Sequence, residues 1–421
     1  MLSKRRRRVV MSLVAGSLML LMMADGTSRG EGWVLGGRGV DVDLAETPIV
    51  VPAAAAMPVG TYTIQGDPDL RSISAVVFED GNRRWLAAVL PAIPAHRALA
   101  YRVALQPESG PSGVRFRESG ANLEVVVDDR PLTTYVPLSN SKPIFFPVLG
   151  PTGSMVTRSY PMVDVPGEDR DHPHQRSCWF THGDVNGIDF WAEDKPGTPP
   201  EKRSKGIIRE TGRRIVMEGP VLGRLETKND WLAPGGRRIG RDRRTVTFYR
   251  TRAVRILDFE VDVEATDGPI TFGETKEGTF GFRLASSMDV NRKQGGKITN
   301  AEGLTDAKAW GKSSPWVDYV GPVEGRTVGL AILNHPQSFR FPTTWHVRDY
   351  GLFAANPFGG KDFKRPEWGA HTIPAGGTLR FAYRVILHEG DTAASRVAAH
   401  FEGYAHPPAL RLTEDQAAGG R

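Results

Sequence analysis

Two segments in the second half of the chain alternate between apolar and polar residues. In the first, Leu257, Phe259, Val261 and Val263 alternate with acidic residues at positions 258, 260, 262 and 264. The second, 379–387, has Leu, Phe, Tyr, Val and Leu at its odd positions. A period of two residues, with one strand face exposed to solvent, is typical of antiparallel strands that cover a hydrophobic core.

Shorter β-type runs, bounded by turn residues, occur along the rest of the chain. They predict further strands at 75–78, 86–90, 101–105, 123–127, 207–209, 245–249 and 328–333, with a hairpin turn at 128–131. Helical periodicity is scarce, and we expect one helix from Asp391 or Thr392 to about Phe401. Together with 47 glycines and 31 prolines, this pattern predicts an all-β fold, a large antiparallel β-sandwich with few helices.

The N-terminus has the pattern of an export signal. Lys4 and four arginines at 5–8 precede an apolar run at 9–24, which is shorter than a membrane-spanning helix needs and fits a secretory signal. We therefore expect residues 1–25 to be a signal peptide, with an uncleaved anchor as the alternative. The protein is then periplasmic or secreted, with no membrane contact beyond the export signal.

The remaining chain divides by composition. Residues 26–60 end in a small, apolar, proline-flanked stretch and are expected to be a leader or linker. We expect one β-sandwich domain at 61–410, with N-terminal strands at 61–148 and the main part at 149–410. The tail at 411–421 is expected to be frayed.

Charge does not indicate a nucleic-acid partner. The chain has 54 basic and 48 acidic residues, but 1–25 hold five of the basic residues and one acidic residue, which leaves 49 against 47. The basic cluster at 237–244 lies between two β-type segments and is expected to be a solvated hairpin or loop. The single cysteine, Cys178, excludes an internal disulfide, and we expect it to be a small buried hydrophobe rather than a nucleophile.

The richest stretch for chemistry is 167–194, which holds His172, His174 and His182. On an extended segment, which Pro173 favours, His172 and His174 would point to one face. They could bind a divalent metal with a carboxylate, act as general acid or base, or brace a loop by hydrogen bonds. No other cofactor is indicated.

Polar neighbours in this stretch have two interpretations each. Arg176 suits a substrate carboxylate or vicinal hydroxyls, or a buried ion pair with Asp171 or Asp184. Asp184 could orient His182 or cap the turn at 186–187 before an expected strand at 188–191.

Later segments add candidates for a substrate site. Glu277 alternates with small residues and threonines from 271 to 279, as a carboxylate in a cleft or on a solvated strand would. Aromatic and polar residues that could hold a sugar follow at Trp310, Trp316, His346 and Asp349, although each tryptophan could instead belong to the core.

Several of these stretches resemble the PmoA-like family of secreted bacterial proteins, named after a methane monooxygenase subunit. The motifs are KPIFFPVLGPTGSMVTRSYPM, DHPHQRSCWFTHGDVNGIDFW, GETKEGTFGFRLA, NAEGLTDAKAWGKSSPWVDY and WHVRDYGLFAANPFG. The resemblance implies a galactose-mutarotase-like β-sandwich that holds sugars on a concave sheet, with 149–410 as the family core. Gln175 stands where the family has a third histidine, and Ser177 and Cys178 replace Gly-Leu.

The leading hypothesis is an exported carbohydrate-active enzyme, a hydrolase, lyase or epimerase. His172, His174, His182 and Glu277 would perform acid–base chemistry, and Arg176, Asp184, Trp310, Trp316, His346 and Asp349 would bind the carbohydrate. One alternative is a non-catalytic carbohydrate-binding envelope protein. The other is a metal-dependent oxygenase, which is disfavoured because methane monooxygenase subunits span membranes, and because a histidine brace needs an N-terminal histidine whereas the first one here is His96.

Overall fold

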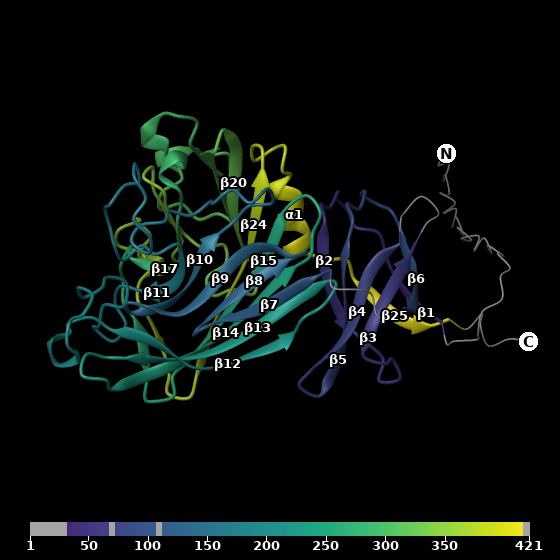
Figure 1. Ribbon diagram of the computed structural model, residues 1–421, viewed down its shortest axis with the longest axis horizontal. Helices are drawn as coiled ribbons and strands as arrows, with labels where there is room; N and C mark the ends of the chain where they lie inside the picture. Colours follow the sequence, from purple (N-terminus) through teal and green to yellow (C-terminus); the bar gives the residue numbers. More distant parts are fainter. Residues whose placement is uncertain (1–31, 67–71, 107–111, 416–421) are drawn as a thin grey trace, which may run out of the picture.

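The computed structural model describes residues 32–66, 72–106 and 112–415. These residues form antiparallel β-sheets in two parts, a sandwich of two eight-stranded sheets and a smaller seven-stranded sheet (Figure 1). The predicted all-β, sandwich-like fold is therefore confirmed. The expected signal peptide at 1–25 lies outside the described residues. Within the described ranges, no helix has the length and apolar character needed to cross a lipid bilayer.

The small sheet combines both ends of the described chain. Its order is β2 (Thr47–Pro52), β5 (Arg83–Leu90), β4 (Ile73–Asp80), β3 (Gly60–Gln65), β6 (Leu99–Leu105), β1 (Trp33–Gly37) and β25 (Leu410–Glu414). Strands β1 and β2 lie where we expected a linker, and β25 takes up part of the expected frayed tail. These short strands are stabilised by partners far away in sequence, since Trp33 pairs with Glu414 and with Val103.

The first sheet of the sandwich carries the candidate site. Its order is β21 (Trp345–Val347), β22 (Leu352–Ala355), β17 (Gly278–Arg283), β11 (Cys178–His182), β10 (Lys142–Val148), β9 (Arg130–Ser139), β8 (Asn122–Val127) and β7 (Val114–Ser119). The predicted hairpin at 128–131 forms the connection from β8 to β9. The expected strand at 188–191 is absent from this sheet; Ile188 forms an isolated bridge with Val185, and residues 190–191 form a bend.

The second sheet contains the two segments with clear alternation. Its order is β12 (Ile207–Met217), β13 (Leu222–Leu232), β14 (Arg238–Tyr249), β15 (Arg255–Glu264), β24 (Thr378–Glu389), β20 (Arg326–Asn334), β19 (Trp316–Val323) and β18 (Lys297–Asn300). A two-stranded sheet adds β16 (Ile270–Phe272) and β23 (His371–Ile373), and short 3-10 turns lie at Pro200–Lys202, Ser286–Met288, Val290–Arg292, Asp306–Lys308 and Pro366–Trp368.

The alternation in β15 and β24 places one face of each strand in the core between the sheets. Phe259 and Val261 are buried there beside Phe381 and Tyr383 of the neighbouring strand. The opposite face is polar, with Asp258 holding Arg384 at 2.6 Å. Burial of the apolar face accounts for the success of the sequence pattern here.

The basic cluster at 237–244 was expected to be a solvated hairpin or loop, and it forms the start of β14, the second strand of the antiparallel β13–β14 pair. Arg241 pairs on the surface with Asp230 at 3.0 Å. Arg244 instead points inward and pairs with buried Asp242 at 2.8 Å. Opposite charges on the neighbouring strands allow this basic segment to belong to a sheet.

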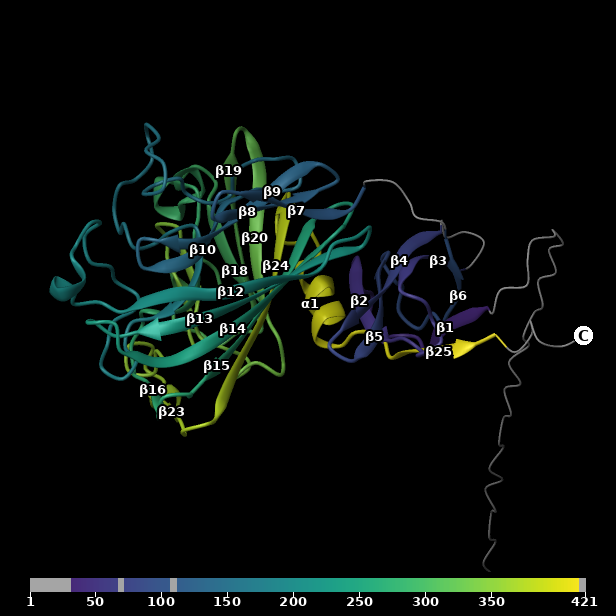
Figure 2. The ribbon, with the colours of Figure 1, turned by 60° about the horizontal axis from the view of Figure 1, so that its bottom comes forward.

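One α-helix, α1 (Val397–Ala405), lies between the sandwich and the small sheet (Figure 2). Its Phe401 belongs to a hydrophobic cluster with Phe78 of the small sheet and Ile386 of the sandwich. The helix begins later than expected because Asp391 caps a turn, accepting bonds from the amides of residues 393 and 394. Arg396 then has a left-handed φ of 54°, so regular helix starts only at Val397.

Candidate functional site

The candidate site lies on the outer face of the first sheet, opposite the sandwich core. On β11, Cys178 and Phe180 face the core, so Trp179 points outward. Register across the sheet places Trp179 beside Gly281, Gly281 beside Ala354, and Ala354 beside His346. We call these four residues the central row. Its middle consists of two small residues, with a tryptophan at one end and a histidine at the other.

Aromatic rings extend from the tryptophan end of the central row over the sheet. The centroids of Trp179 and Trp191 are 5.2 Å apart, and those of Trp191 and His174 are 6.4 Å apart. His174 packs edge-on against His172 at 5.8 Å, and His172 stacks on Tyr350 at 5.2 Å with an interplanar angle of 6°. The histidine pair predicted from sequence is therefore part of an aromatic assembly.

The assembly continues from Tyr350 back to the histidine end of the row. The guanidinium of Arg348 lies 5.7 Å from the Tyr350 ring and 5.8 Å from the Trp310 ring. Trp310 lies 6.5 Å from His346. We define the rim as the connected side chains that link the two ends of the central row: Trp191, His174, His172, Tyr350, Arg348 and Trp310.

His172 is oriented by a carboxylate. Its Nδ1 is 2.7 Å from Oδ2 of Asp171, which fixes the Nδ1 proton and leaves the lone pair on Nε2. The side chain of His172 is 41% exposed, so Nε2 can reach a ligand. The backbone here is not extended as predicted: His172 has φ of 41° and residues 173–174 form a turn. The two rings nevertheless meet because the turn folds one beside the other.

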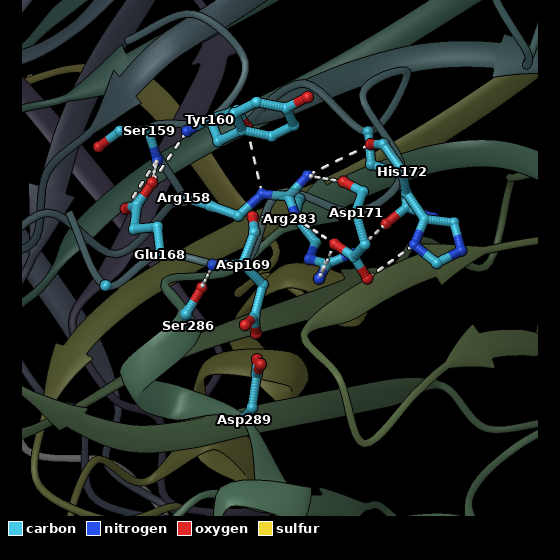
Figure 3. A network of polar contacts seen from close by, with 12 residues as sticks. Arg158, Ser159, Tyr160, Glu168, Asp169, Asp171, His172, Arg283, Ser286 and Asp289 are labelled. Atoms are coloured by element: carbon cyan, nitrogen blue, oxygen red, sulfur yellow. Dashed lines mark hydrogen bonds and ion pairs between the residues drawn. The ribbon is translucent and has the colours of Figure 1, made fainter. Parts of the chain in front are cut away.

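Two buried arginines hold Asp171 in place (Figure 3). Arg158 bonds its carboxylate and also the carbonyls of Asp171 and His172, at 3.0 and 3.2 Å. Arg283, from the outward face of β17, bonds the same carboxylate oxygen at 2.8 Å. Burial alone would raise the pKa of Asp171, but Arg283, the His172 bond and Arg158 outweigh it and hold that pKa below its usual value.

His174 is kept neutral at physiological pH. Burial is the main cause that lowers its pKa to about 4, and the charges of Lys142 and His172 add to it. Glu193 and Glu277 act in the opposite direction, which places both carboxylates within electrostatic reach of the ring. A neutral imidazole in this position can donate or accept a hydrogen bond without a charge of its own.

Glu193 forms ion pairs through its carboxylate with two cationic side chains beneath the rim. Its carboxylate lies 2.6 Å from Nζ of Lys142 and 2.9 Å from Nε of Arg176, and all three side chains are buried. Burial favours the protonated acid, but Lys142 and Arg176 lower the pKa of Glu193 overall. The predicted substrate ligand Arg176 therefore has a structural partner, which is neither Asp171 nor Asp184.

Glu277 is more accessible. It precedes β17 on the outward-facing alternation, its side chain is 32% exposed, and Nζ of Lys276 is its ion-pair partner at 2.7 Å. Its charge acts on both His174 and Tyr350. Of the carboxylates named so far at the site, Glu277 alone has no arginine partner among the described residues.

Several buried polar atoms on and around the central row have no hydrogen-bond partner in the described part of the chain. They are Nε1 of Trp179, Trp191 and Trp310, Oγ1 of Thr181, Nδ1 of His346 and Nε of Arg283. Unpaired buried donors are costly unless water or a ligand satisfies them. These atoms gather on the outward side of the first sheet, in or beneath the rim.

Four predicted site residues lie elsewhere. His182 faces the core with Phe180, packs between Phe272 and Phe358, and bonds the carbonyl of Gly273 at 2.8 Å. Burial is the main cause that lowers its pKa to about 4.

The other three are placed by local structure. Asp184 caps the turn, accepting the amide of Gly187 at 2.9 Å, and does not bond His182. Trp316 packs in the cluster between the sandwich and the small sheet. Asp349 bonds Asn291 through its carbonyl and acts electrostatically on Tyr319, away from the central row.

The residues do not fit the divalent metal site that the sequence left open. Among the described residues, no three His, Cys, Asp or Glu side chains gather in a way that could hold a metal ion. Nδ1 of His172 is bonded to Asp171, and Gln175, at the family's third histidine position, accepts a bond from Arg283 at 2.5 Å. We therefore derive no step through a metal.

Comparison with solved structures finds proteins of low similarity. An α-mannosidase from Enterococcus faecalis V583 matches with a TM-score of 0.40 and 10% identity, over 93% of this chain and 46% of that one. A glycosyl hydrolase family 38 protein from Enterococcus faecalis has a TM-score of 0.39 and 10% identity, over 92% and 48%. The GH36 α-galactosidase AgaA from Geobacillus stearothermophilus matches with a TM-score of 0.33 and 10% identity, over 66% of this chain and 40% of that one. The chain thus spans about half the length of the first two.

No functionally curated protein matches the chain. A family model matches residues 122–402, two thirds of the sequence and nearly all of the sandwich with its site. The chain therefore belongs to DUF6807, a family of unknown function.

Proposed function

We propose that this protein is a carbohydrate-active enzyme whose site is formed by the partly exposed side chains of the rim, above the buried central row. The observation that carries the proposal is the Asp171-oriented His172, open at Nε2, beside a group of unpaired buried polar atoms. Sugar hydroxyls can both donate and accept hydrogen bonds, and aromatic faces pack on the apolar faces of sugar rings. Export through residues 1–25 remains part of this proposal.

Within that class, the side chains favour proton abstraction over two-carboxylate hydrolysis. A glycosidase of the common type needs two carboxyl groups flanking the bond that breaks. Here Glu193 and Asp171 are each paired with two cations, whereas Glu277 is 32% exposed and pairs with Lys276. The reaction that fits this set is elimination or epimerisation, with His172 and Glu277 as the two proton-transfer groups.

The chemistry suggests the kind of sugar. A sugar C–H becomes acidic enough for histidine when it is adjacent to a carbonyl or carboxylate, as in keto sugars and uronates. Arg348 lies between the rings of Tyr350 and Trp310 and has no ion pair with any described residue. Its guanidinium is suited to hold that carboxylate or carbonyl while Nε2 of His172 takes the proton. Asp171 would then stabilise the imidazolium.

The test is incubation of the purified protein in D₂O with a panel of uronates, keto sugars and neutral glycosides, followed by NMR. We expect deuterium beside a carboxylate or carbonyl, or an unsaturated product. His172→Ala should lower kcat by about 10²- to 10⁴-fold, and Glu277→Gln should lower it comparably. His96→Ala, whose ring is exposed on the small sheet, is the matched control.

Two outcomes would contradict the proposal. Full turnover by His172→Ala would exclude its role as the base. Tight sugar binding by the wild type that is unchanged in His172→Ala, with no turnover of any panel member, would instead identify a binding protein.

A further inference from the structure

A second candidate binding site lies between the sandwich and the small sheet, away from the central row. It is a cavity of about 570 Å³. The part with the small sheet contributes Glu46, Ser72 just before β4, and residues of β4 and β5 such as Ser74. The sandwich contributes the β8–β9 turn and the β14–β15 turn, with Asp128, Arg130, Arg250, Arg252 and Arg255. Its volume is within the range of small-molecule sites, about 300–1,000 Å³.

The acidic residues of this cavity are already occupied. Asp128 pairs with Arg250 at 2.8 Å. Glu46 accepts the backbone amide of Arg252 at 2.9 and 3.1 Å, which links the small sheet to the β14–β15 turn without using the Arg252 side chain. Burial is the main cause that raises the pKa of Glu46.

The remaining arginines make no direct ion pair with a described residue, although the charges of Asp128 and Glu46 reach Arg255. Arg255 is 8% exposed and makes no hydrogen bond or ion pair with its guanidinium to any described residue. Arg130 and Arg252 are exposed at the cavity and also have no ion pair there. Four arginines against two carboxylates leave a surplus of two positive charges in the lining. A buried guanidinium without a partner is costly, and an anion would remove that cost.

We propose that this cavity binds a sugar-sized ligand that carries a tetrahedral oxyanion, a phosphate or sulfate ester. Planar guanidinium groups bind such oxyanions through paired hydrogen bonds. The hydroxyls of Ser72 and Ser74 can bond the ring hydroxyls, while Val89, Pro91 and Val221 offer an apolar surface. The proposal does not depend on the catalytic role of His172, because the two sites share no residue.

The ligand would contact both parts of the protein at once. Ser74 belongs to β4 of the small sheet, whereas Arg255 begins β15 of the sandwich. Binding should therefore stabilise their contact and raise the unfolding temperature of the whole chain.

Isothermal titration calorimetry of the full chain tests the proposal with glucose 6-phosphate, glucose 6-sulfate, glucose and inorganic phosphate. We expect both esters to bind with a Kd below about 1 mM, with glucose at least tenfold weaker. Arg255→Gln and Arg252→Gln should each weaken ester binding about tenfold or more. Arg326→Gln, on the exposed β19–β20 turn, is the matched control and should bind as the wild type does.

Loss of ester binding in Arg252→Gln supports the site even if Arg255→Gln fails to fold, because the Arg252 side chain is exposed. The proposal is overturned if neither ester binds, if both arginine variants bind normally, or if glucose binds as tightly as its esters. Equal affinity for inorganic phosphate and the esters would contradict the proposal that the ligand is as large as a sugar.

Discussion

The indole ring of Trp179 lies directly over Gly281 on the neighbouring strand. A Cβ at position 281 would come within 2.9 Å of Cζ2 and 3.0 Å of Cε2 of that ring. The ring cannot move away freely, because Trp179 is 1% exposed and packs against Trp191. The absence of a side chain at Gly281 therefore leaves the space that the Trp179 ring occupies.

Gly281→Ala should destabilise the protein by about 1–3 kcal/mol, the usual cost of forcing extra volume into a packed site. Urea unfolding measures the loss, and near-UV circular dichroism should show a displaced indole. Gly212→Ala is the matched control, since a Cβ there meets nothing within 4 Å. Equal stability of the two variants would show that the indole yields without strain.

Asp171→Asn removes the charge that Arg158 and Arg283 share. Both guanidinium groups are almost fully buried, with side-chain exposures of 0% and 1%. Leaving them without a counter-charge should lower the free energy of unfolding by about 1–3 kcal/mol, less than for a fully buried pair because the Asp171 side chain is 41% exposed and screened by solvent. Asp164→Asn breaks an exposed pair with Arg170 and should cost less than about 1 kcal/mol. The prediction is wrong if both variants unfold at the same urea concentration.

Buried histidines should make the protein sensitive to acid. Burial is the main cause that lowers the pKa to about 4 in His174 and His182 and to about 3 in His346 and His400. Unfolded histidine titrates near about 6.5, so between about pH 4 and 6.5 the unfolded state binds more protons. These groups therefore make the free energy of unfolding rise with pH across that window, and their contribution is lost as pH falls.

Replacing one of these histidines should reduce the change in the free energy of unfolding with pH. His182→Gln keeps a donor for the carbonyl of Gly273 but cannot take up the proton. We expect its slope of stability against pH between about 4 and 6.5 to fall by up to about 1.4 kcal/mol per pH unit. His96→Gln controls for the substitution, and an identical slope in His182→Gln and wild type would contradict the prediction.

Asp289 should make the free energy of unfolding fall as pH rises, opposite to the buried histidines. Burial is the main cause that raises its pKa to about 7, with Asp169 adding to it while Arg283 and Arg292 oppose it; Figure 3 shows the carboxyl groups of Asp169 and Asp289 facing each other. The folded chain thus retains a proton that the unfolded chain releases near about pH 4. Stability from this group is full below that pH and lost as pH rises to about 7.

Asp289→Asn should therefore gain stability relative to the wild type as pH rises from about 4 to 7. The relative gain should be on the order of 2 kcal/mol once solvent screening is allowed for. Urea unfolding at matched pH values measures it. A constant difference between the two proteins at all pH values would contradict the prediction.

Local patterns in the sequence were enough to predict the sheets but not the site as a whole. Alternation identified β15 and β24 because burial of one strand face repeats every two residues. The density of histidines indicated 167–194, and two of its histidines, His172 and His174, lie in the rim. Arg283 was not predicted, because it reaches Asp171 across 112 residues and nothing local indicates that pairing. Lys142, buried beneath the rim, also has no signal in its own segment.

His182 shows where a better use of the same pattern would have helped. Treating 178–182 as one strand places His182 on the same face as Cys178 and Phe180, both expected to be buried. The ring would then have been predicted to face the core, as it does. The PmoA-like resemblance and the carbohydrate substrate remain predictions, and the D₂O experiment tests the substrate.

The pairing of β25 with β1 constrains how the protein can be made in a cell. Val34 and Thr413 are neighbours in the sheet but lie 379 residues apart in the chain. At a synthesis rate of roughly 5–20 residues per second, β1 leaves the ribosome about 20–75 s before its partner exists. Throughout that interval its outer edge is open to other chains. A message cut short before codon 410 should therefore yield a product that aggregates even though its sandwich is complete.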